Sequence, residues 1–257
     1  MRSLERAAPP AVSAEPGALL GFLEDTLTIA EAELRKIRHE PSELVTRAAQ
    51  PVLWLLVFGS VLARTRAIDT GPLGYLDFLA PGVLAQSALF IAIFYGLAVI
   101  WERDLGIIQK LLVSPAPRPA LVLGKASAGG VKGLVQGLII YVLAILIGIH
   151  VRLDPPAVLG VALTVFLGSA LFATFSLIVA CVVRSRERFM GIGQLMTMPL
   201  FFASSAVYPV SAMPPWLQGL ARINPLTYMV DAIRSLMIEG AVSVDGLGLD
   251  LAVLLVG

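Results

Sequence analysis

Long runs without a charged residue alternate along this chain with short segments that carry most of the charge. A helix needs about 20 apolar residues to cross the hydrocarbon core of a bilayer, so each long run predicts a membrane span. The last run reaches Gly257 before it is long enough, and we expect the polypeptide to continue beyond it. The predicted spans lie at about residues 43–63, 78–101, 127–150, 156–183, 189–207 and 247–257, the last incomplete. The pattern predicts an all-α polytopic membrane protein.

The composition supports a membrane protein and excludes a soluble enzyme. Apolar residues make up 57% of the 257 positions, and charged residues only 14%. An ordinary soluble domain carries about 25% charged residues, and one of this length has too little interior to bury so much apolar surface. The net charge of +1 provides no general basic field, so we expect no nucleic-acid partner.

The distribution of basic residues predicts the orientation in the membrane. Lys and Arg are enriched in short cytoplasmic loops. With the N-terminus inside, fourteen of the 19 basic residues lie on the inner side and five on the outer side. We therefore expect a cytoplasmic N-terminus.

Two segments precede the first predicted span. Residues 1–17 are rich in Pro and Ala, and we expect a disordered cytoplasmic tail rather than a signal peptide. Residues 18–40 carry apolar side chains every three or four positions, which predicts an amphipathic helix. We expect this helix to lie along the inner membrane surface, with a coiled-coil or partner-binding helix as the alternative. Residues 41–257 form the predicted transmembrane domain.

A charged segment that becomes amphipathic joins the second and third predicted spans. It begins at Glu102-Arg103-Asp104 and stops at Ser114-Pro115, a sequence that ends helices. Its apolar residues on one side of a short helix are Leu105, Ile108, Leu111 and Leu112. At the cytoplasmic face this helix would be either a lever pressed by a soluble partner or a solvated connector.

Three glycines spaced by four residues, Gly129, Gly133 and Gly137, lie in the third predicted span. Small residues at this spacing let another helix approach closely. The groove favours packing within the subunit, and the seam of a homodimer is the alternative.

Two proline-led motifs follow the fifth span, within residues 209–240. Met213-Pro214-Pro215-Trp216 indicates a short helix with proline at its start and a Trp suited to the membrane interface. A second helix begins at Asn224-Pro225 and contains Tyr228; Asn224 can cap it, and its first turn accepts Pro225. Two short helices joined by a kink predict a re-entrant outer lid over a pathway.

No catalytic, cofactor-binding or metal site is predicted. Gly124-Lys125-Ala126 lacks the upstream Gly and the following Ser or Thr of a phosphate loop. Cys181 is the single cysteine, and His39 and His150 lie far apart, so no Cys- or His-based metal centre is expected. The centres of the predicted spans carry no charge, which argues against a proton relay. If the chain moves a solute, the energy must come from elsewhere.

Three features, taken in order, resemble the membrane subunit of a type-2 ATP-binding-cassette (ABC) exporter. The first is the loop from Glu102-Arg103-Asp104 to Leu111-Leu112-Val113-Ser114-Pro115. The second is Gly124-Lys125 with the Gly-rich start of span three, and the third runs from Pro214-Pro215-Trp216-Leu217 through Asn224-Pro225-Leu226-Thr227-Tyr228 to Arg234. The resemblance covers about residues 20–240 and is nearest to drug-resistance and nodulation-factor exporters.

The resemblance implies six spans, an interfacial N-terminal helix, a cytoplasmic coupling helix and re-entrant outer helices. It implies that residues 102–112 contact a nucleotide-binding (ATPase) subunit, and that this chain pairs with a copy of itself or a paralogous permease. The chain itself then binds no cofactor, and ATP and Mg²⁺ bind to the partner. The implied location is the cytoplasmic membrane of a prokaryote, among membrane lipids.

The expected function is outward transport of a lipophilic drug, a lipid or a lipid-linked glycan by a chain that is not an enzyme. A membrane-embedded lipid-modifying enzyme would need a cluster of acids, His or metal at one face. The outer acids form no recognisable ligand motif; they are Asp77, Asp154, Asp231, Glu239 and Asp245. A secondary transporter or channel would show intramembrane charge or an internal repeat, and an ABC importer permease a Glu-Ala-Ala loop; the sequence has none of these.

Overall fold

The computed structural model describes residues 26–28, 30–31, 49–65, 68–113, 117–183 and 185–256. These residues are almost entirely helical, and this part of the chain has no strand beyond an isolated bridge between Val151 and Ile238. The predicted tail and most of the predicted interfacial helix lie outside the described residues.

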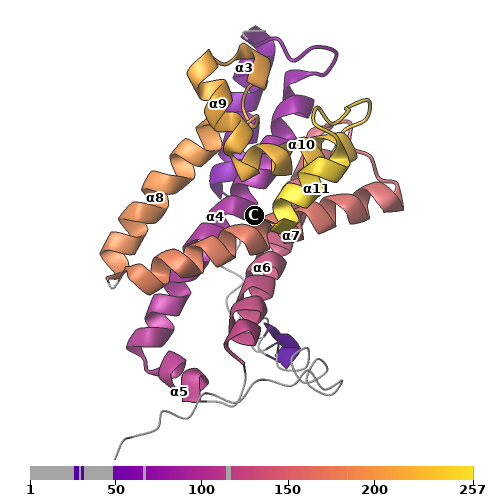
Figure 1. Cartoon of the computed structure of the whole chain (residues 1–257). Coiled ribbons are helices and arrows are strands. Elements are labelled where there is room, and N and C mark those ends of the chain that lie inside the picture. The colour runs from indigo at the N-terminus through magenta and orange to yellow at the C-terminus, as the bar shows by residue number, and fades with distance from the viewer. Residues whose placement is uncertain are drawn as a thin grey trace, which may run out of the picture.

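Three long helices form the centre of the bundle: α4 (Tyr75–Asp104), α6 (Arg118–Ile147) and α7 (Pro155–Val182). Within the described residues, these are the helices long and apolar enough to cross a membrane. α4 is central, because it packs against α6, α7, α8 and α10 (Figure 1). Uninterrupted apolar runs explain why the ends of α4 and α7 lie within a few residues of the ends of the predicted spans.

Shorter elements surround this centre. An apolar helix over Ala49–Thr65 changes to π geometry at η1 (Trp54–Gly59) and ends as α3 (Ser60–Thr65). In Figure 1, α5 lies at one end of the bundle, and α3 and α9 lie at the other. The remaining elements are α5 (Ile107–Val113), α8 (Arg186–Phe202), η2 (Val210–Ala212), α9 (Pro215–Ile223), α10 (Pro225–Met237) and α11 (Leu247–Val256).

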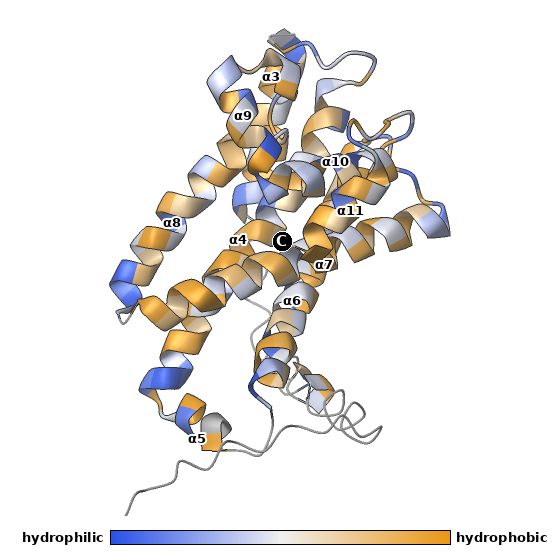
Figure 2. Ribbon diagram, viewed as in Figure 1, coloured by the Kyte–Doolittle hydropathy of each residue, from blue (hydrophilic) through white to orange (hydrophobic). Residues whose placement is uncertain are grey.

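The outward faces of the long helices are apolar. Leu138 and Leu146 on α6 are 63% and 77% exposed, and Leu159 on α7 is 70% exposed. Apolar colour covers both the inside and the outside of these helices, and the hydrophilic residues concentrate towards their ends (Figure 2). Hydrocarbon, rather than water, is the solvent that suits such a surface.

Two helices have bounds that differ from the predicted spans. α6 begins at Arg118, nine residues before the predicted start, because Pro119 suits a first turn and an ion pair compensates the charge of Lys125. α8 ends at Phe202 rather than near residue 207. Pro199 lies in its last turns, and the Ser204 hydroxyl donates to Phe201 O over 2.7 Å, which replaces the next turn of helix.

The glycines of α6 face α7. A methyl group at Gly129 would overlap Ala173, and one at Gly133 would overlap the side chain of Ser169. At Gly137 the added group would press on Val165. The groove therefore receives a helix of the same chain, which is the packing favoured by the sequence.

Candidate functional site

A cluster of charged residues joins four helices where α4 ends. The inner-end cluster, named for the orientation that the sequence predicts, consists of Glu102, Arg103 and Asp104 on α4, Lys125 on α6 and Arg186 on α8. Lys125 Nζ donates to Glu102 Oε2 over 2.6 Å, and the two side chains are only 8% and 9% exposed. Two buried charges are tolerated together because each compensates the other. This pair fixes α6 to α4.

Arg103 and Asp104 extend the cluster to α7 and α8. Arg103 Nη1 donates to Ala180 O and Val183 O, over 3.3 and 3.4 Å, at the C-terminal end of α7. A cation is favourable there because the last carbonyls of a helix carry partial negative charge. Arg186 Nη2 donates to Asp104 Oδ2 over 2.8 Å, and its guanidinium stacks 3.5 Å from the ring centroid of Trp101. Consecutive residues of one helix end thus contact three other helices.

The chain turns sharply after this cluster. Gly106 has φ of 74°, a left-handed conformation that glycine adopts without strain, and α5 follows directly. Leu105 is 68% exposed and Val113 is 86% exposed, while Ile108 is half-buried. Leu111 and Leu112 belong to α5, but their side chains lie outside the described part of the structure. The predicted coupling segment is therefore two pieces: a helix end held by its neighbours, and a short helix on which Ile107, Gln109 and Val113 are exposed.

The predicted outer residues lie at the opposite end of the bundle. Pro214 precedes α9, Pro215 is in its first turn, and Trp216 is 68% exposed. The Asn224 side chain accepts from Leu226 N over 3.0 Å, and Pro225 opens α10, so the predicted cap is confirmed. The Tyr228 hydroxyl donates to Arg222 O over 2.6 Å and closes the turn between α9 and α10.

Asn224 also links this outer segment to α8. Its Nδ2 donates to Leu200 O over 2.7 Å and to Ala203 O over 3.2 Å, which satisfies carbonyls at the end of α8. Burial raises the pKa of the nearby Tyr208 hydroxyl, which donates to Phe202 O over 2.5 Å. One asparagine therefore caps the start of one helix and the end of another.

Arg234 is a buried cation that sequence reasoning did not single out as a structural centre. Its guanidinium donates to Ser205 O over 2.6 Å and to Phe78 O over 3.3 Å, and it lies 3.8 Å from the centroid of the Phe78 ring. It joins α10 to α4 and to the turn after α8. Its position as the one basic residue of a helix with a buried apolar face was the available signal.

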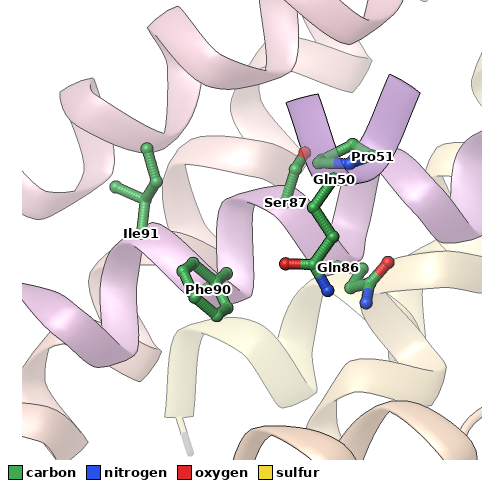
Figure 3. A pocket seen from close by; sticks show the side chains of 6 residues that line it. All are labelled: Gln50, Pro51, Gln86, Ser87, Phe90 and Ile91. Carbon is green, nitrogen blue, oxygen red and sulfur yellow. The ribbon is translucent and has the colours of Figure 1, made fainter. Parts of the chain in front are cut away.

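A small pocket lies where the helix of Ala49–Thr65 meets α4 (Figure 3). Its polar lining includes Gln86, which is only 4% exposed and whose Oε1 has no hydrogen-bond partner within the described residues. A buried amide oxygen without a partner favours a ligand or water that can donate a hydrogen bond. The other lining residues are Gln50, Pro51, Ser87, Phe90 and Ile91.

Comparison with known proteins finds one matching family and several relatives. Residues 24–238 match the ABC-2 type transporter family. The relatives include "Putative transport permease ycf38" of Cyanophora paradoxa, 28% identical over 84% of this chain and 74% of the relative. They also include the inner membrane transport permease YadH of Escherichia coli, 25% identical over 74% of this chain and 73% of its own length. The daunorubicin resistance ABC transporter permease protein DrrB1 of Streptomyces coeruleorubidus is 24% identical over 82% and 74%.

This chain belongs to the ABC-2 type transporter family, because the family match covers most of its length. It is a transport permease of a membrane, as the sequence resemblance predicted. The all-helical class is confirmed, with three long apolar helices in the described residues and two shorter ones at Ala49–Thr65 and Leu247–Val256.

Proposed function

We propose that this permease is the membrane subunit of an ATP-driven exporter that moves a lipophilic drug, a lipid or a lipid-linked glycan outward. The observation that carries the proposal is α5, an exposed helix that directly follows the charged end of α4. Exposed apolar residues beside paired charges suit the docking of a soluble protein. The expected partner is an ATPase subunit that binds ATP and Mg²⁺, since this sequence has no phosphate loop of its own.

The inner-end cluster gives α5 a connection to the rest of the bundle. A displacement of α5 acts on the end of α4, and from there on α6, α7 and α8 through Glu102, Arg103 and Asp104. ATP binding shifts the permease only if the partner contacts two permease conformations differently. We assign Glu102 and Arg103 to transmission within the permease, and Leu105 and α5 to contact with the partner.

The outer segment is the proposed gate. Pro214, Pro215 and Trp216 begin α9, whereas Asn224 and Tyr228 fix the turn into α10. Because Asn224 bonds to the end of α8, a movement of α8 would carry α9 and α10 with it. Coupling between α5 and this segment through α4 and α8 would open the pathway outward.

A lipophilic substrate with a polar group is supported by two observations. One relative is named for resistance to daunorubicin. The pocket beside Gln86 combines an apolar wall with amide and hydroxyl groups. We propose that this pocket is one contact point along the pathway.

A second permease, identical or paralogous, is proposed to cover α8. This helix packs mainly against α4, and it exposes Met190 by 51% and Leu195 by 73%. An apolar face of this kind also suits lipid, so the composition of the complex has to be measured.

The test is co-purification of the full chain with a candidate ABC ATPase subunit, followed by reconstitution into vesicles. We expect co-elution as two permeases and two ATPases, with ATPase activity that changes on reconstitution. Replacing Ile107→Asp together with Val113→Asp should lower recovered ATPase about tenfold or more, a loss of about 1.4 kcal/mol or more in binding. The control is Leu153→Asp, since Leu153 is 64% exposed in the loop after α6, away from α5.

Recovery of the ATPase with the double variant at the level of the control would refute the docking role of α5. A permease that purifies alone, without an ATPase under any mild detergent condition, would refute the exporter assembly itself.

A further inference from the structure

Three carboxylates converge between α10 and α11, although the sequence predicted no metal site. Asp231 comes from α10, Asp250 from α11, and Asp245 from the segment that joins them. One oxygen of each lies within 4.8 Å of the others. Asp231 is 4% exposed and Asp250 is 0% exposed, whereas Asp245 faces outward. The fold therefore assembles a set of oxygen ligands that the linear sequence separates.

The fully buried carboxylate of Asp250 lacks a partner at one oxygen. Asp250 Oδ2 contacts the Ser243 hydroxyl, but within the described residues Oδ1 has no hydrogen-bond partner. A buried carboxylate oxygen without a donor bears the full cost of its desolvation. This oxygen therefore favours a bound cation or a proton.

The hydroxyl of Ser243 cannot satisfy both buried acids. Ser243 Oγ lies 3.0 Å from Asp231 Oδ2 and 2.9 Å from Asp250 Oδ2, and it accepts from Gly246 N. A hydroxyl has one hydrogen to donate, so only one of the two contacts is a hydrogen bond at any moment. The other contact brings two electron-rich oxygens together, a repulsion that a proton or a cation relieves. Asp231 Oδ2 also accepts from Val244 N over 2.7 Å and from Asp245 N over 3.4 Å, whereas among the described residues Asp250 has no backbone donor of this kind.

The protein's own charges do not neutralise the cluster. Arg234 lies one turn from Asp231 on α10, but its donors go to Phe78 O and Ser205 O. In the described part of the chain no Lys, Arg or His forms an ion pair with any of the three acids. The start of α11 contributes about half a positive charge at most. Three carboxylates against one arginine leave an excess of negative charge beside an apolar helix.

We propose that Asp231, Asp245 and Asp250 bind a divalent cation of the calcium class. Calcium takes oxygen ligands at about 2.3–2.6 Å in a flexible geometry, which suits three carboxylates that come from two helices and the segment between them. Magnesium requires a near-ideal octahedron and gives up its water reluctantly, so it suits such a set of ligands less well. The bound ion fixes the start of α11 to α10, next to the proposed outer gate.

The test is equilibrium dialysis of ⁴⁵Ca²⁺ against the full-length permease in mild detergent, stripped with chelator, near neutral pH. We expect one saturable site per chain, a higher melting temperature with Ca²⁺, and at least about tenfold weaker competition by Mg²⁺. Asp245→Asn should weaken binding about tenfold or more without affecting folding, since Asp245 is exposed. Asp250→Asn should abolish binding and reduce the dependence of stability on Ca²⁺.

The matched control is Glu239→Gln, which removes an exposed acid from the same connecting region and should bind Ca²⁺ like the wild type. Equal binding by wild type and Asp245→Asn overturns the proposal. The proposal is also overturned if Ca²⁺ does not change the stability of the wild type and acidification raises it, because a proton shared by the carboxylates then takes the place of the cation. None of these readouts involves transport, so the exporter proposal stands or fails separately.

Discussion

Lys125 and Glu102 form a buried ion pair of 2.6 Å that joins α6 to the end of α4. The pair lies one helix turn before the chain leaves the bundle to form α5. The next two residues of α4, Arg103 and Asp104, contact α7 and α8. Glu102 and Lys125 are the most buried residues of the inner-end cluster. Separating these two charges should therefore cost more stability than separating any other charges of the cluster.

Removing one member of this pair should destabilise the permease strongly. Lys125→Met removes the cation that lies 2.6 Å from the buried Glu102 carboxylate, and the expected loss is about 3–5 kcal/mol of stability. The double variant Lys125→Met with Glu102→Gln should recover most of it, since no charge remains buried. Thermal unfolding in detergent for the full double-mutant cycle measures the coupling. Equal melting temperatures for the Lys125→Met variant and the wild type would contradict the buried pair.

The exposed pair of Asp104 and Arg186 should behave differently. Both side chains are more than a third exposed, so Asp104→Asn should cost only about 0–1 kcal/mol. If the cluster transmits movement from α5 to α8, Asp104→Asn should nevertheless lower substrate-stimulated ATPase in the reconstituted complex. Exchange of the two charges, Asp104→Arg with Arg186→Asp, should restore part of it. Asp154→Asn, which alters an exposed pair with Arg152 in the loop after α6, is the control.

The sequence predicted elements well where a single local property determines them. The uninterrupted apolar runs defined α4 and α7, and the Asn224 cap followed from residue preferences alone. Contacts between residues far apart in the sequence could not be predicted in this way. Glu102 and Lys125 are 23 positions apart. Glu102 was predicted in the coupling segment and Lys125 was noted in a Gly-Lys motif, but no sequence pattern indicated that the two form an ion pair. Arg234 and Asp231 were assigned to the outer side, but their burial depends on how α10 packs against α4 and α11.

Close packing of α6 and α7 should make Gly133 intolerant of a side chain. Gly133→Ala places a methyl group on Ser169, and overpacking of this kind costs about 1–3 kcal/mol. The compensating change Ser169→Gly should recover part of the stability. Gly191→Ala on α8 is the control, because no atom lies within 4 Å of the added group. There the greater helix propensity of alanine should be neutral or stabilising by about 0.5–1 kcal/mol. Melting temperatures of the wild type and the three variants show whether packing or helix propensity determines the effect.

Asn224 has two roles that two substitutions should separate. Asn224→Asp keeps the oxygen that accepts from Leu226 N but loses the donor to Leu200 O and Ala203 O. It also places a negative charge against those carbonyls, so α10 stays capped while its link to the end of α8 is broken. Asn224→Ala loses both, and the cap alone is worth about 0.5–2 kcal/mol.

We therefore expect Asn224→Ala to lower the melting temperature more than the removal of an exposed side chain such as Gln194→Ala on α8. A pair of spin labels at exposed positions, Leu195→Cys on α8 and Trp216→Cys on α9 in a Cys181→Ala background, measures the link itself. Asn224→Asp should broaden the distance distribution between the labels, because the α8 end is no longer fixed to the start of α10. An unchanged, narrow distribution in that variant would mean that packing alone holds the outer segment on α8, and that Asn224 is a helix cap and nothing more.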